Sequence, residues 1–83
     1  KGRRKMRELT KLLNNEEAAV VALKGGRSFT SRMASMGLTV GVRVKMLQNF
    51  GRGSLIILVR DTRIALGRGE ASKILIGGST GDK

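Results

Sequence analysis

Serine hydroxyls are the side chains of this sequence that come nearest to a catalytic pattern. The candidates are Ser28, Ser31, Ser35, Ser54 and Ser72. A serine nucleophile needs a neighbouring base to accept its proton, and the chain contains no histidine. A serine–lysine arrangement is not visible in the spacing. We therefore expect no catalytic residue and no enzymatic activity.

Ligands for a metal ion or a phosphate group are equally scarce. The chain lacks both histidine and cysteine, which are the commonest ligands for transition metals. The carboxylates Glu8, Glu16, Glu17, Asp61 and Glu70 are scattered along the sequence. The glycine-rich segment 77–83 lacks the Gly-Lys-Ser/Thr order of a phosphate-binding loop, and no helix follows it. The sequence predicts no cofactor and no dedicated iron site.

Positive charge is the strongest feature of the composition, with a formal net charge of +11. Part of it lies at the start, in Lys1, Arg3, Arg4 and Lys5. Between Arg27 and Arg68, Asp61 is the single acidic residue among the basic ones. Such a surface favours acidic proteins, nucleic acids or anionic membranes as partners, although a basic surface can also serve solubility alone.

Three residues are candidates for contact with a partner. Phe50 lies in a predicted loop beside Arg52, where an exposed aromatic ring next to a cation would suit a protein interface. The alternative is a ring folded back onto the domain. Arg32, on a predicted helix, is the third candidate. A nucleic-acid interface is weaker, because Phe29 and Phe50 are the only aromatic residues available for base stacking.

A short helix over residues 29–36 must position Arg32. Phe29, Met33 and Met36 recur at i, i+4 and i+7, so they share one face of this helix. Ser28 is the predicted N-cap, because its hydroxyl can accept a free backbone N–H.

A glycine is predicted to end this helix and a second one to lead into the next strand. Gly37 suits the left-handed position after the helix, with Leu38 packed on Met33 as in a Schellman ending. Gly41 offers a second permissive backbone position before an alternating segment. In that segment Val42, Val44 and Met46 are expected to face inward, and the residues between them to face water.

Short apolar runs predict the strands of the domain. They lie at residues 18–23, 42–46, 55–59, 63–66 and 73–76, and a further apolar anchor lies at 9–13. The run 55–59 is the most apolar and is expected to be the central strand. Asp61-Thr62 is expected to connect a hairpin, and residues 67–73 to form a loop with one helical turn.

Five to six short strands with a helix between the first two predict an all-β fold, a small SH3-like barrel. The predicted domain covers residues 8–76, between a disordered basic segment at 1–7 and a flexible tail at 77–83. No apolar run approaches the ~20 residues of a membrane-spanning helix, and no signal peptide is visible. We expect a cytoplasmic protein.

The order of the motifs resembles the FeoA family. The resemblance rests on Leu9-x-x-Leu12, Arg-Met-Ala-Ser-Met-Gly-Leu at 32–38, Val-Gly-Val-Arg-Val at 40–44, and the segments 63–66 and 70–76. It implies an SH3-like barrel and an accessory role in bacterial ferrous-iron uptake, with the FeoB permease as partner. The implied fold is also similar to the C-terminal domain of iron-dependent repressors.

The chain departs from this family at a few positions. Val40 stands where the family often has proline, and Asp61-Thr62 where it often has glycine. The family is often described as transition-metal-binding, but no histidine or cysteine supports that here. Two alternatives to the iron-uptake role remain open: a basic nucleic-acid-binding module, and the regulatory domain of a metal-dependent repressor.

Overall fold

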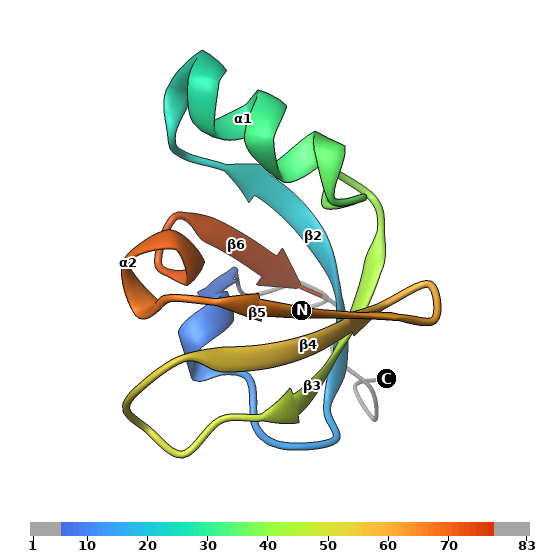
Figure 1. The fold of residues 1–83 in the computed structure, drawn as a ribbon, viewed down its shortest axis with the longest axis vertical. Coiled ribbons are helices and arrows are strands. Elements are labelled where there is room, and N and C mark those ends of the chain that lie inside the picture. The colour runs from blue at the N-terminus through green and yellow to red at the C-terminus, as the bar shows by residue number, and fades with distance from the viewer. Residues whose placement is uncertain (1–5, 78–83) are drawn as a thin grey trace, which may run out of the picture.

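The computed structural model describes residues 6–77 as one curled antiparallel sheet with a helix at one end (Figure 1). The sheet has six strands in the order β1-β6-β2-β3-β4-β5. The strands are β1 (Arg7–Glu8), β2 (Glu17–Leu23), β3 (Arg43–Gln48), β4 (Leu55–Val59), β5 (Thr62–Leu66) and β6 (Ile74–Gly77). The helices are the 3-10 turn η1 (Leu9–Lys11), α1 (Gly26–Ser35) and α2 (Arg68–Ala71). The predicted all-β fold of five to six strands is confirmed.

Three details differ from the sequence-based expectations. The first strand, β1, begins at Arg7, one residue before the predicted domain start. Because β1 precedes β2, α1 follows the second strand and not the first. The run 55–59 forms β4, which pairs with β3 and β5 and so lies beside an edge strand and not at the centre. The predicted disordered segment 1–7 and flexible tail 77–83 fall mostly on residues 1–5 and 78–83, which lie outside the described residues, while Arg7 and Gly77 lie in β1 and β6.

The β4–β5 hairpin turns one residue earlier than expected. Val59 pairs with Thr62, so the two connecting residues are Arg60 and Asp61. Both have positive φ angles, 49° and 74°. Two such residues define the type I′ turn, whose twist matches that of the flanking strands. The prediction of an Asp61-Thr62 connection was therefore wrong by one position.

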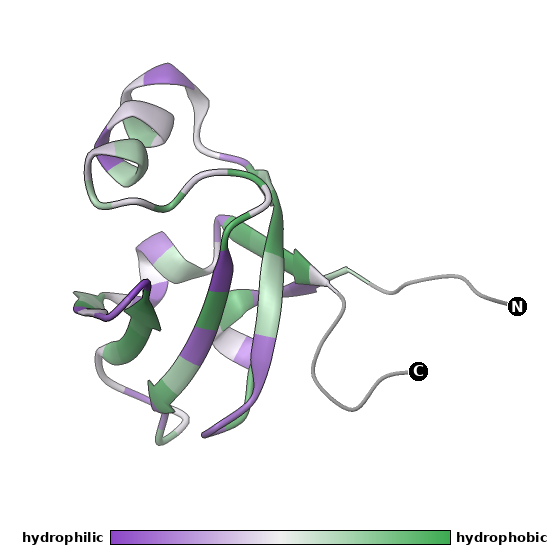
Figure 2. Ribbon diagram, turned by 90° about the vertical axis from the view of Figure 1, so that its right-hand side faces the viewer, coloured by the Kyte–Doolittle hydropathy of each residue, from purple (hydrophilic) through white to green (hydrophobic). Residues whose placement is uncertain are grey.

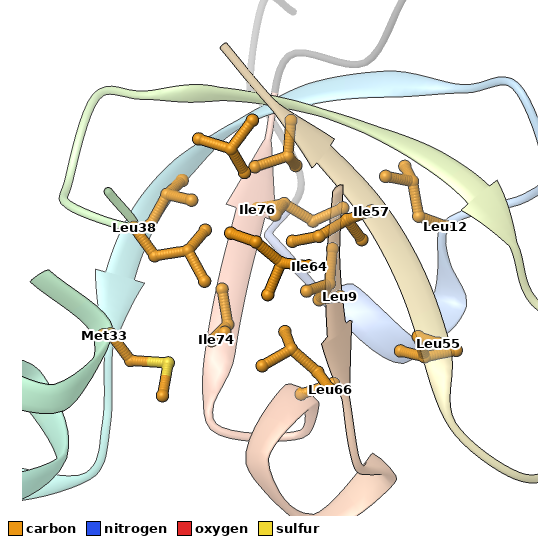
Figure 3. Packing of buried hydrophobic residues seen from close by; sticks show 14 of the residues in the cluster. Leu9, Leu12, Met33, Leu38, Leu55, Ile57, Ile64, Leu66, Ile74 and Ile76 are labelled. Atoms are coloured by element: carbon orange, nitrogen blue, oxygen red, sulfur yellow. The ribbon is translucent and has the colours of Figure 1, made fainter. Parts of the chain in front are cut away.

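The inner face of the curled sheet holds the hydrophobic core. Alternation decides which residues enter it: Val42, Val44 and Met46 are buried, as predicted, while Arg43 is exposed. Figure 2 shows hydrophobic and hydrophilic residues alternating along β3. In Figure 3 the side chains of β4, β5 and β6 converge on one another. The described residues include no buried polar side chain, so packing of apolar groups is what stabilises the barrel.

Helix α1 starts earlier than predicted, and Ser28 is not its N-cap. The N-cap is Gly25, and Ser28 lies exposed within the helix. At this start the Phe29 ring packs against the backbone of Gly25. A Cβ atom on Gly25 would overlap that ring, so this close approach requires glycine. Phe29 and Met33 are buried on the helical face that the periodicity predicted.

The predicted end of α1 is confirmed. Gly37 has φ +89°, and its N–H donates to the Ala34 carbonyl at 2.9 Å. The N–H of Leu38 donates to the Met33 carbonyl, also at 2.9 Å, which completes a Schellman motif. Gly41, at φ +97°, donates its N–H to the Val20 carbonyl at 2.7 Å and so attaches the following turn to β2.

Replacing Gly37 tests this ending. We expect Gly37→Val to lower the free energy of unfolding by more than about 1 kcal/mol, because a β-branched residue is strained at this φ angle. Steric overlap does not cause this loss of stability, since the nearest atom to an added Cβ, Val59 Cγ1, lies 3.7 Å away. The measurement is urea denaturation. The control is Gly69→Val, at an open position without a positive φ, and an equal loss in both variants would contradict the assignment.

Candidate functional site

The structure does not bring the predicted contact residues together. Arg32 lies on α1, whereas Phe50 and Arg52 lie in the loop between β3 and β4 at the opposite end of the domain (Figure 1). Phe50 is 72% exposed, so the alternative of a ring folded back onto the domain is wrong. These residues belong to two separate surfaces.

The backbone beside Phe50 is held by the side chain of Asn49. Its amide group donates to the carbonyls of Thr10 and Leu12 at 3.0 and 2.8 Å, and its oxygen accepts the N–H of Gly51 at 3.0 Å. The N–H of Asn49 in turn donates to Asn14 Oδ1 at 2.7 Å. Asn49 therefore joins the N-terminal segment to the β3–β4 loop.

Arg68 reinforces the same loop from α2. Its guanidinium donates to the Gly53 carbonyl and to Asn49 Oδ1, both at 3.1 Å. The sequence offered no signal for this pair, because the two residues lie 19 positions apart. The hydrogen bonds restrict the loop backbone, so Phe50 is presented from a defined position.

Arg32 contributes to a different surface, between α1 and α2. Its Nη2 atom lies 2.8 Å from Glu70 Oε2, and both side chains are partly exposed. The Phe29 ring lies 5.4 Å from Lys73 Nζ and 6.0 Å from Arg32 Cζ. Exposed ion pairs contribute about 1 kcal/mol or less, so this pair adds little to the stability of the fold. A hollow of about 250 Å³ lies here, lined by Gly25, Ser28, Phe29, Arg32 and Lys73.

A third surface, which sequence analysis did not identify, is a groove of about 420 Å³ on the outer face of the sheet. We call it the outer groove; it is lined by Leu47, Gln48, Ile56, Leu58 and Arg63. Ile56 and Leu58 are the half-buried residues of β4, between the buried inward residues. The register between β3 and β4 shifts between Met46 and Gln48, so Gln48 pairs with Ile56 and joins Leu47 at the rim of the groove.

A signal for this groove was present in the sequence. A strand with one face in water alternates apolar and polar residues, but residues 55–59 are apolar at every position. That pattern is typical of a strand covered on both faces. In the structure only the inner face of β4 is covered by the core.

The acidic residues do not fit a metal centre. Glu16, Glu17 and Glu70 lie 3.5, 3.6 and 2.8 Å from the guanidinium groups of Arg7, Arg43 and Arg32. Within residues 6–77, no three acidic side chains gather closely enough to hold an ion. We derive no metal chemistry for this part of the chain. No helix within the described ranges has the length and apolar character needed to cross a membrane.

Comparison with known proteins identifies the family. The FeoA domain model matches residues 7–77. The chain belongs to the FeoA family. A relative named "Putative Fe(2+) transport protein A", from Methanocaldococcus jannaschii, is 36% identical over 61 residues, which are 74% of this chain and 73% of the relative. The predicted resemblance is therefore confirmed, and it associates the chain with ferrous iron transport.

Solved FeoA structures share the fold. A crystal structure of the iron uptake regulatory protein FeoA is 29% identical, with a TM-score of 0.82, over 87% of this chain and 96% of that one. A zinc complex of FeoA from Stenotrophomonas maltophilia, described as a prokaryotic SH3 domain protein, is 25% identical, with a TM-score of 0.72, over 82% and 86%. The SH3-like prediction is thus confirmed.

The expected likeness to repressor domains also appears. A manganese-dependent transcriptional repressor matches with a TM-score of 0.79 and 17% identity, over 89% of this chain and 42% of the repressor. At this identity the likeness concerns the fold alone.

Removing the Asn49 side chain tests the support of the Phe50 loop in this FeoA domain. We expect Asn49→Ala to lower the free energy of unfolding by about 1–3 kcal/mol, because the Leu12 carbonyl loses the Asn49 donor and the Thr10 carbonyl keeps only Arg68, at 3.4 Å. Hydrogen exchange of the Gly51 amide should accelerate as well. Urea denaturation and NMR measure the two effects. Ser54→Ala, an exposed neighbour, serves as the control, and unchanged exchange at Gly51 would contradict the role of Asn49.

Proposed function

We propose that this FeoA domain is a non-enzymatic accessory protein of ferrous-iron uptake that acts in the cytoplasm by binding a FeoB-type permease. Its family membership supports the link to iron transport. The observation that carries the binding role is the outer groove, where Ile56 and Leu58 leave the second apolar face of β4 without a covering layer. A half-buried apolar floor beside an exposed arginine is a surface on which a partner segment can pack.

Charge supports the same role. The net charge of +11 creates a positive field that accelerates encounter with an acidic protein or with the anionic face of a membrane. Arg52, on the Phe50 loop, and Arg63, beside the outer groove, are both exposed. Charge complementarity of this kind mainly raises the association rate, while the apolar contact determines how long the complex lasts.

Ferrous iron is the cargo of the transport system in this proposal, and the FeoA domain acts on the permease. The side chains of the sequence support that division, because the chain offers neither imidazole nor thiolate. The glutamates at positions 16, 17 and 70 already lie beside arginines.

A basic nucleic-acid-binding module is the second candidate, and the net charge is the observation that favours it. The structure offers little for base stacking, since Phe29 is 6% exposed and only Phe50 projects into solvent. A regulatory domain of a metal-dependent repressor is the remaining alternative, which the similarity in fold to the manganese-dependent repressor favours.

Binding to the cytosolic domain of the permease tests the proposal. We expect calorimetry to detect a complex at low salt whose affinity falls moderately as salt rises, because part of the attraction is electrostatic. The same titration with duplex DNA tests the nucleic-acid-binding alternative, which predicts a loss of DNA affinity by orders of magnitude over a few-fold rise in salt. Absence of permease binding at both low and moderate salt would refute the proposal.

A further inference from the structure

The outer groove has an apolar floor within a continuous sheet. Ile56 and Leu58 form the floor on β4, and the backbone of β4 pairs with β3 on one side and β5 on the other. The backbone N–H and C=O groups beneath the groove therefore face neighbouring strands. A segment lying over β4 finds no free backbone partner there, which favours a segment that satisfies its own backbone hydrogen bonds. An α-helix does so internally.

The groove extends over three strands. Its rims come from β3, through Leu47 and Gln48, and from β5, through Arg63, with β4 between them. Strands lie about 4.8 Å apart, so the backbones that carry the two rims are roughly 10 Å apart. Ala65, the cross-strand neighbour of Ile56, has a small side chain that leaves the β5 side of the floor open.

The charged residues around the groove indicate which side chains the bound helix carries. Arg63 is exposed and takes part in none of the ion pairs of residues 6–77. Leu58 lies between Arg63 on β5 and Lys45 on β3, and Lys45 in turn pairs across the sheet with Glu17 on β2. Arg63 is therefore the cation best placed to bind a carboxylate of an incoming segment. A second copy of this chain would instead bring two strongly basic surfaces together.

We propose that the outer groove binds an amphipathic helix of the partner protein, with the apolar stripe of that helix on Ile56 and Leu58 and a carboxylate on Arg63. The binding helix carries apolar residues at i, i+3 or i+4, and i+7, with aspartate or glutamate beside them. The identity of the partner as the permease rests on the proposed function, whereas the chemistry of the binding segment rests on the groove.

Photo-cross-linking in cells that express the full chain with the permease tests this proposal. A photoreactive phenylalanine analogue replaces Ile56 in one variant and Val40 in the control, which is apolar, 62% exposed and outside the groove. Mass spectrometry then identifies the cross-linked peptide. We expect a strong product from position 56 only, in a segment with the apolar and acidic pattern described above. A peptide of this same chain, a peptide without that pattern, or equal yields at both positions would overturn the proposal.

A pair of charge reversals tests the role of Arg63. Arg63→Glu and Arg27→Glu change the net charge equally, but Arg27 lies on α1, outside the outer groove. We expect Arg63→Glu to weaken binding of the permease domain about tenfold more than Arg27→Glu does. Circular dichroism confirms that both variants fold. Equal losses of affinity in the two variants would mean that only the overall positive field of the domain affects binding, and would overturn the carboxylate contact.

The two proposals fail in different ways. If the permease binds but position 56 gives no specific product, the groove proposal is wrong and the proposed function stands. If position 56 cross-links to a patterned acidic helix of another protein, while the permease does not bind, the groove proposal stands and the proposed function is wrong.

Discussion

The hydrogen bond from Leu38 N–H to the Met33 carbonyl fixes the corner on which the rest of this domain depends. It ends α1, places Gly37 in the left-handed region and directs the chain toward β3. The next turn is attached to β2 through Gly41, and β3 then pairs with β2 and β4. Because the side-chain period of a strand is two, this register decides which residues enter the core.

The same register leaves apolar side chains on the outer face of the sheet. The core takes every second residue of β4, and the residues between them form the floor of the outer groove. In a FeoA domain of this size most of the sheet must serve the core, so a second apolar face without a covering layer is informative. It is the surface on which the proposed contact with another macromolecule rests.

The three surfaces differ in how firmly their residues are held. Asn49 and Arg68 tie the Phe50 loop to the N-terminal segment, and strands on both sides hold the floor of the outer groove. The surface around Arg32 depends on one partly exposed ion pair with Glu70. Residues that are held in place before binding lose less conformational entropy in a complex. The groove and the Phe50 loop are therefore the better prepared surfaces.

Local sequence determined strands β2 to β6, the face of α1 and its ending, because periodicity and the backbone freedom of Gly37 act over a few residues. The start of α1 was not predictable in this way, since it depends on how the Phe29 ring packs against Gly25. Tertiary structure alone decided the separation of Arg32 from Phe50, the bonds of Arg68 to a loop distant in sequence, and the open outer face of β4. Each of these features depends on how segments distant in sequence meet. The strand pairing of the whole sheet determines that, and a local sequence pattern does not contain it.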